Sequence, residues 1–140
     1  MQTMFLPRFL KGRCRHIKCL KTITLAFLHI MPVSVGHTLI VPKAEAENIF
    51  ELENEPGSEV FKTTKKVAHG IQASLNPTGL IITQLNGTDA GQTVFHYHMH
   101  IIPVYEKIPL RMHGKEIEDS EALAKTAKII KQAGVDISAD

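Results

Sequence analysis

The stretch VFHYHMHIIP, residues 94–103, places histidine at three alternate positions. Side chains alternate between the two faces of a β-strand, so a strand here would put His96, His98 and His100 on one face, with successive side chains about 6–7 Å apart. Tyr97 would point to the opposite face. Because a buried imidazole needs a partner for each ring nitrogen, we expect the histidine face to carry chemistry and not to pack in the core.

The residues alone leave three interpretations of this histidine face open: a solvated edge strand, a metal site, and a nucleophilic or acid-base site. Two histidines at i and i+2 can reach one zinc ion, but the carboxylate that precedes them, Asp89, lies in the loop before the strand. That loop, NGTDAGQT at residues 86–93, has glycines that expose backbone N–H groups, and Gln92 and Thr93 add an amide and a hydroxyl. The combination favours a phosphate cradle beside the imidazoles.

Length and composition predict one globular domain. The chain has 140 residues, 44% of them hydrophobic and 21% charged, which is long enough to bury a core. Charged residues or histidine interrupt every long apolar run, so we expect a soluble protein with no membrane partner. Two cysteines are too few for a disulfide framework, which favours a reducing, cytoplasmic location.

The charge is unevenly distributed along the chain. Residues 1–44 contain seven Lys and Arg and no acidic residue, whereas residues 45–140 contain nine Lys and Arg and fourteen Asp and Glu. The two parts therefore carry formal charges of +7 and −5. A targeting peptide and a nucleic-acid-binding arm are both compatible with this basic start. Serine is absent from the first 33 residues and no clean amphipathic period appears, so we expect a tail without a specific task and no nucleic-acid partner.

Hydrophobic patterns along the chain predict an α+β protein. Apolar and β-branched runs predict four strands, at residues 22–30, 38–42, 80–85 and through the histidines, with the first two forming a hairpin whose turn is indicated by Pro32 and Gly36. Helical periodicity predicts a short helix over 44–54 ended by Pro56 and Gly57, a main amphipathic helix from an N-cap at Ser58, and a C-terminal helix from an N-cap at Ser120 to a stop at Gly134. The residues expected on the apolar faces are Val60, Phe61, Thr64, Val67, Ala68, Ile71 and Leu75 in the main helix and Leu123, Ala127 and Ile130 in the C-terminal helix.

The segment AGQTVFHYHMHIIP, residues 90–103, resembles the histidine triad signature, in which three histidines alternate with apolar residues. The resemblance extends from Thr22 to the C-terminus, through LAFLHIMPVSVGHTLIVPK, and is strongest to the bacterial and Hint-like branch of nucleoside phosphoramidate and dinucleotide hydrolases. It implies an antiparallel sheet of about five strands, one main packing helix and a C-terminal helix over residues 22–140. It also implies a homodimer, a purine nucleotide substrate and no cofactor.

The same resemblance implies a role for each site residue. His98 is expected to attack the α-phosphorus of a purine nucleoside phosphoramidate or dinucleoside polyphosphate, forming a nucleotidyl-histidine that water cleaves. A backbone carbonyl is expected to hold its Nδ1. The expected catalytic residues are His98, His100 and His96, and the expected nucleotide-binding and phosphate-binding residues are His29, His37, Asn86, Gly91, Gln92 and Thr93.

Three departures from the family pattern limit this expectation. His29 stands where the family usually has a ribose-binding aspartate, so a nucleotide-binding regulatory protein with little turnover is the alternative. Four residues separate Cys14 from Cys19, and Glu45 replaces a zinc-binding histidine, so we expect no structural metal. Residues 1–21 are unlike the family's first strand and are expected to form a divergent basic segment.

Overall fold

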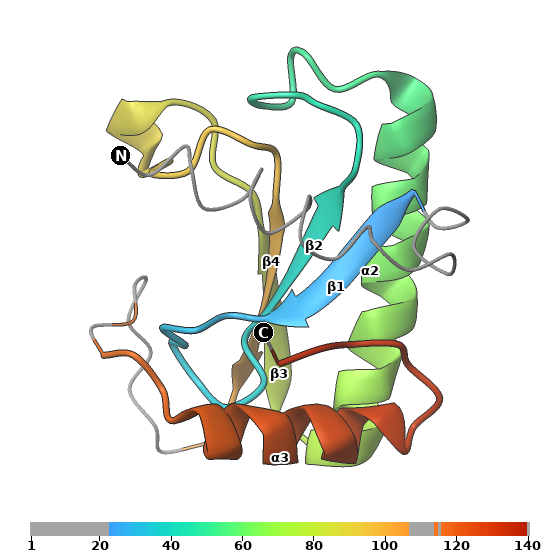
Figure 1. The fold of residues 1–140 in the computed structure, drawn as a ribbon, viewed down its shortest axis with the longest axis vertical. Helices are drawn as coiled ribbons and strands as arrows, with labels where there is room; N and C mark the ends of the chain where they lie inside the picture. Colours follow the sequence, from blue (N-terminus) through green and yellow to red (C-terminus); the bar gives the residue numbers. More distant parts are fainter. Residues whose placement is uncertain (1–22, 107–113, 115, 140) are drawn as a thin grey trace.

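The computed structural model describes residues 23–106, 114 and 116–139, so the basic segment 1–21, including Cys14 and Cys19, lies outside the described residues. The described part confirms the α+β class (Figure 1). Its elements are β1 (Thr24–Leu28), β2 (Thr38–Pro42), α2 (Asn54–Leu75), β3 (Gly79–Thr83), the 3₁₀ turn η3 (Thr88–Ala90), β4 (Met99–Val104) and α3 (Ser120–Lys131).

The strands form one antiparallel sheet in the order β1-β2-β4-β3. The predicted hairpin is confirmed, since β1 pairs with β2 from Thr24 opposite Pro42 to Leu28 opposite Thr38. The described residues contain four strands, one fewer than the family resemblance implies. The C-terminal segment runs beside β1, where the Leu28 N–H donates to the Ser138 carbonyl at 2.8 Å.

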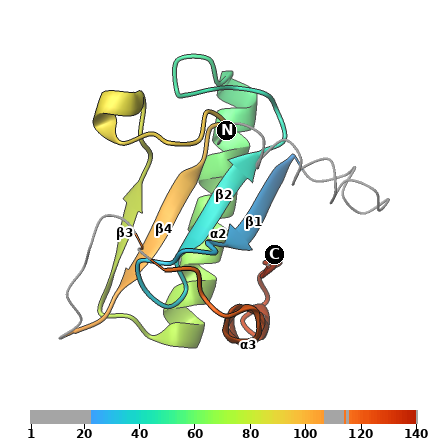
Figure 2. The same cartoon turned by 60° about the vertical axis from the view of Figure 1, so that its left-hand side comes forward.

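The two faces of the sheet have different environments, because successive residues of a strand point to opposite sides. Figure 2 shows α2 crossing one face. On that face Ile40 and Ile101 are completely buried and belong to the main core with Val67 and Ile71 of α2. The opposite face carries a smaller apolar cluster of Phe27, Leu39 and Val41, with Leu25 and Val94 packed against it. His100 lies on this second face.

The main helix begins earlier than the sequence predicts. Its N-cap is Glu53, and both Pro56 and Gly57 lie within its first turn. Proline fits there because the first-turn N–H groups have no intrahelical acceptor, so nothing is lost when one is missing. The expected helix over 44–54 and the N-cap at Ser58 are therefore wrong, and residues 44–53 form turns and bends.

Helical periodicity identified most of the buried faces. Val60, Thr64, Val67 and Ile71 of α2 are buried as predicted, but Phe61 is 68% exposed. In α3 the predicted residues Leu123, Ala127 and Ile130 are buried. Its N-cap is one residue earlier than expected, at Asp119, whose Oδ2 accepts from the Ala122 N–H at 3.2 Å. Gly134 follows with a φ of 83°, the left-handed conformation that commonly ends a helix.

No helix among the described residues combines the length and the apolar character needed to cross a membrane.

Gly70 sets the distance between α2 and the segment after α3. A Cβ at this position would collide with Cγ2 of Val135, which is buried. We expect Gly70→Leu to lower the free energy of unfolding by about 2 kcal/mol, because overpacking costs more than the roughly 1 kcal/mol that replacing a helical glycine returns. Thermal and urea unfolding measure this change.

Gly79→Leu is the matched control, since nothing lies within 4 Å of a Cβ built at Gly79. Equal melting temperatures for the two variants would contradict the close-packing explanation for Gly70.

Candidate active site

The three alternate histidines do not share one strand. β4 begins at Met99, so His100 lies in the strand while His96 and His98 belong to the segment before it. His96 is 6% exposed, and its Nε2 donates to the Pro42 carbonyl at 2.8 Å. The expectation that one strand carries all three histidines is therefore wrong for His96 and His98, and the imidazole of His96 ties the segment before β4 to the end of β2.

A main-chain carbonyl orients His98. Its Nδ1 lies 2.7 Å from the carbonyl oxygen of His96, and a carbonyl can only accept, so Nδ1 carries the ring proton. The lone pair of the neutral ring is then on Nε2. Burial lowers the pKa of His98, although the hydrogen bond to the His96 carbonyl opposes this shift. The result is a neutral imidazole with a defined nucleophilic nitrogen.

A second hydrogen-bonded chain fixes His37 and His100. The Val33 N–H donates to Nδ1 of His37 at 3.0 Å, and Nε2 of His37 lies 2.9 Å from Nδ1 of His100. Because Nδ1 of His37 accepts, its Nε2 carries the proton and donates to His100, whose own proton must then be on Nε2. His100 therefore offers a donor where His98 offers a lone pair.

His37 is only 3% exposed, and it lies next to other imidazoles. Its ring centroid is 5.2 Å from that of His100 and 4.6 Å from that of His29. Burial, followed by repulsion from His29, His100 and His98, holds the pKa of His37 far below its usual value of 6.5. His37 thus remains neutral near pH 7, as the hydrogen-bonded chain requires.

One pocket on the second face of the sheet brings much of the predicted site together. His98 and His100 have ring centroids 4.9 Å apart within it. Among the described residues that line it there is no carboxylate, lysine or arginine. Its lining consists of His29, Leu39, Thr83, Leu85, Gly91, Thr93, Val94, His98, His100 and Ile102.

Gln92, one of the predicted phosphate-binding residues, does not line the pocket. Its side chain is part of a buried clamp, with Oε1 accepting from the Gly87 N–H at 2.7 Å and Nε2 donating to the carbonyls of Glu47 and Val94. The N–H groups of Gly91 and Gln92 also donate to carbonyls within the loop. This amide joins the loop of residues 44–53 to the loop that holds Thr93.

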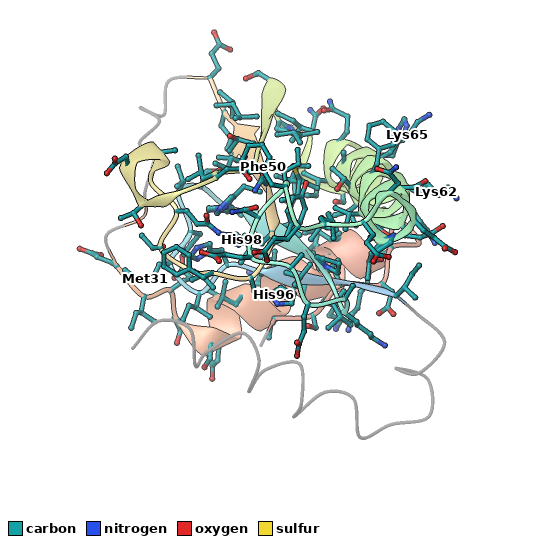
Figure 3. All side chains as sticks on the ribbon, turned by 90° about the horizontal axis from the view of Figure 1, so that it is seen from above. Met31, Phe50, Lys62, Lys65, His96 and His98 are labelled. Carbon is teal, nitrogen blue, oxygen red and sulfur yellow. The ribbon has the colours of Figure 1, made fainter. Side chains whose placement is uncertain are left out.

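Asn86 joins the same two loops. Its Oδ1 accepts from the Ile49 N–H at 2.9 Å and from Nε2 of Gln84 at 2.7 Å. In Figure 3, Lys62 and Lys65 project outward from α2 and away from His98. Asn86 and Gln92 therefore support the walls of the pocket, and neither is among the residues that line it.

Sequence reasoning missed the main-chain donors of the loop between β1 and β2. Met31 and Val33 place their N–H groups on Nδ1 of His29 and His37 respectively. Pro32 and Gly36 indicated a turn in this loop, and Gly36 has a φ of 90°, but no residue pattern shows which N–H points at an imidazole.

The described residues contain no group of three metal-ligating side chains, and the expectation about zinc stays a prediction because Cys14 and Cys19 lie outside them.

Comparison with known proteins identifies the family. A family model described as the HIT domain matches residues 20–107, which is more than half of the chain. This chain therefore belongs to the HIT domain family.

Relatives and solved structures agree with this assignment. "Protein hit" of Bacillus subtilis is 48% identical over 59% of this chain and 57% of its own length. The adenosine 5'-monophosphoramidase hnt1 of Schizosaccharomyces pombe is 38% identical over 69% of this chain and 70% of its own. A HIT-like protein of Bartonella henselae has a TM-score of 0.76 at 34% identity, covering 81% of this chain and 82% of the other.

The matches to the first curated relatives span little more than half of their length, at 56–58%.

The buried neutral histidine predicts acid sensitivity. Because the pKa of His37 is lowered by folding, the unfolded chain takes up a proton below pH 6.5 while the folded chain does not, so the free energy of unfolding falls as pH falls. His37 alone should contribute a slope of about 1.4 kcal/mol per pH unit well below pH 6.5. Urea unfolding between pH 7.5 and 5 measures it.

His37→Gln should flatten this slope, because the variant has no imidazole to protonate at that position. A slope equal to that of the wild type would show that other groups cause the acid sensitivity.

Proposed function

We propose that this chain is a nucleotidyl hydrolase that cleaves a purine nucleoside phosphoramidate or dinucleoside polyphosphate at the α-phosphate. The observation that carries the proposal is the geometry of His98, whose Nδ1 is bound to the His96 carbonyl at 2.7 Å so that Nε2 keeps its lone pair. The similarity to the phosphoramidase hnt1 of fission yeast supports the same reaction class.

The reaction proposed for His98 has two steps. Nε2 attacks the α-phosphorus, a P–Nε2 bond forms, and the P–N or P–O bond to the leaving group breaks. The phosphorylated imidazole carries a positive charge, which the His96 carbonyl stabilises through Nδ1–H. Water then cleaves the adduct: its oxygen bonds to phosphorus as the P–Nε2 bond breaks, and the proton it gives up balances the one that the leaving group takes up on departure. This releases the nucleoside monophosphate and restores neutral His98.

The residues around His98 complete the proposed mechanism. The Nε2–H of His100 and the hydroxyl of Thr93 would donate to the phosphoryl oxygens as charge develops on them. His37 keeps His100 in the donating tautomer, and His96 positions His98 through its carbonyl. Asn86, Gln92 and Gly91 would act by holding the loop that carries Thr93.

Replacement of the proposed nucleophile tests the function. We expect His98→Ala to reduce hydrolysis of adenosine 5'-phosphoramidate by at least about a thousandfold, because the covalent step is lost. Mass spectrometry of the quenched wild-type reaction should show an AMP adduct on His98. The melting temperature should change by only a few degrees, since His98 is not part of the apolar core.

Activity of His98→Ala within tenfold of the wild type would rule out the assignment. Nucleotide binding by the wild type with no turnover and no adduct would instead support the regulatory alternative.

We also propose that the protein is a homodimer formed through the β3 edge of the sheet. In the described residues β3 pairs on one side with β4 and its other side is unpaired. Next to this edge lies an apolar groove of about 440 Å³ between α2 and the sheet, lined by Phe61, Leu80, Ile82 and Met99 among others. A second copy can pair its own β3 there and bury both grooves, extending one antiparallel sheet across the pair.

Ile82, 48% exposed on this edge, provides the test. Ile82→Asp should convert the dimer to a folded monomer, because a buried carboxylate at the interface would have no partner. Light scattering after size-exclusion chromatography gives the mass. Ile117→Asp, at a residue that is 74% exposed elsewhere, should remain dimeric. A monomeric wild type, or a dimeric Ile82→Asp, would contradict this interface.

A further inference from the structure

The loop after β1 fixes the tautomer of a second pocket histidine, His29. The Met31 N–H donates to Nδ1 of His29 at 2.9 Å. A nitrogen that accepts a hydrogen bond carries no proton, so the proton of neutral His29 is on Nε2. His29 therefore presents Nε2–H as a donor, as His100 does. The Met31 N–H that fixes this tautomer is only two residues from the Val33 N–H that donates to His37.

Three imidazoles form a row in the pocket. The ring centroids of His98 and His100 are 4.9 Å apart, and those of His100 and His29 are 6.1 Å apart with the rings inclined by 23°. Charge-assisted hydrogen bonds span only about 2.7–2.9 Å between heavy atoms. A single phosphoryl group bound at His98 and His100 is therefore too small to fill the whole row. His29 lies at the end of the row opposite His98.

The lining of the pocket determines which ligand groups suit this row. His29, Thr83, Thr93 and His100 supply ring N–H or hydroxyl groups, and the described lining residues include no carboxylate that would repel an anion. Hydrogen bonds to an ionised acceptor are roughly twice as strong as those between neutral groups. A ligand with two anionic groups would place one at His98 and His100 and the other at His29. A ligand with a single phosphate would offer His29 only neutral hydroxyl groups.

We propose that His29 is a phosphate-binding residue and that the preferred ligand carries a second phosphoryl group beside the one that His98 attacks. This inference rests on the proposed function, which assigns the first phosphoryl group to His98 and His100. The second phosphoryl group is either the next one in a polyphosphate chain or a phosphate on the ribose. His29 thereby determines specificity, and it takes no part in the covalent step.

Isothermal titration calorimetry with three nucleotides tests the proposal and separates the two sources. AMP carries one phosphate, ADP adds a second in the chain, and adenosine 3',5'-bisphosphate adds a second on the ribose. The wild type should bind one of the two doubly phosphorylated ligands at least tenfold more tightly than AMP. The identity of that ligand assigns the source of the second phosphate.

Two substitutions at His29 sharpen the result. His29→Gln retains an amide donor and should keep most of the preference. His29→Asp puts a carboxylate at the far end of the row, so it should reduce affinity for the doubly phosphorylated ligand by more than tenfold and raise affinity for AMP, whose ribose hydroxyls can donate to it. Ala124→Asp, exposed on α3, adds the same charge elsewhere and should leave all three affinities unchanged.

Two outcomes overturn the proposal: a wild type that binds AMP as tightly as both other nucleotides, and a His29→Asp variant that keeps the wild-type preference. Failure of the proposed function gives a different result. In that case the binding preference is present, but adenosine 5'-phosphoramidate is not hydrolysed and His98 acquires no AMP.

Discussion

Hydrogen bonds from main-chain atoms to imidazole rings decide what each pocket histidine can do. The His96 carbonyl accepts a hydrogen bond from Nδ1–H of His98. The N–H groups of Met31 and Val33 instead donate to Nδ1 of His29 and His37. A carbonyl can only accept and an N–H can only donate, so the backbone gives chemically identical side chains opposite roles. One ring presents a nucleophile and its neighbours present donors.

This arrangement depends on the division of the sheet into two faces. Because α2 covers one face and fills it with aliphatic side chains, the other face can hold polar groups without interrupting the main core. The clamp made by Gln92 then fixes the pocket wall from outside, through hydrogen bonds to Gly87, Glu47 and Val94. Fully bonded buried amides hold a loop in one position more firmly than exposed ones, which suits a site where the donors must be aligned in advance.

The sequence predicted the features that arise from local patterns. β2 and the buried positions of α3 follow directly from apolar periodicity, and the alternate histidines with their glycine loop indicated the site. The failures at the site have a common physical origin in contacts between distant segments. The imidazole of His96 donates to the Pro42 carbonyl and lies before the strand that the sequence predicted for it. Gln92 donates to main-chain carbonyls, and the type of a residue does not reveal where its carbonyl lies. Pro56 failed as a stop signal because a first turn accepts proline as readily as a loop does.

Keeping the histidines neutral has an energetic consequence that connects stability to chemistry. Burial of His37 removes the water that would stabilise an imidazolium, and repulsion from the adjacent imidazoles acts in the same direction. The lowered pKa of His98 has the same principal cause. A carboxylate beside these rings would reverse the effect by attracting protons, and it would also repel a phosphate. A pocket lined by imidazoles and hydroxyls satisfies both requirements at once, because its described lining residues add no carboxylate and still offer N–H and O–H groups to an anion that enters it.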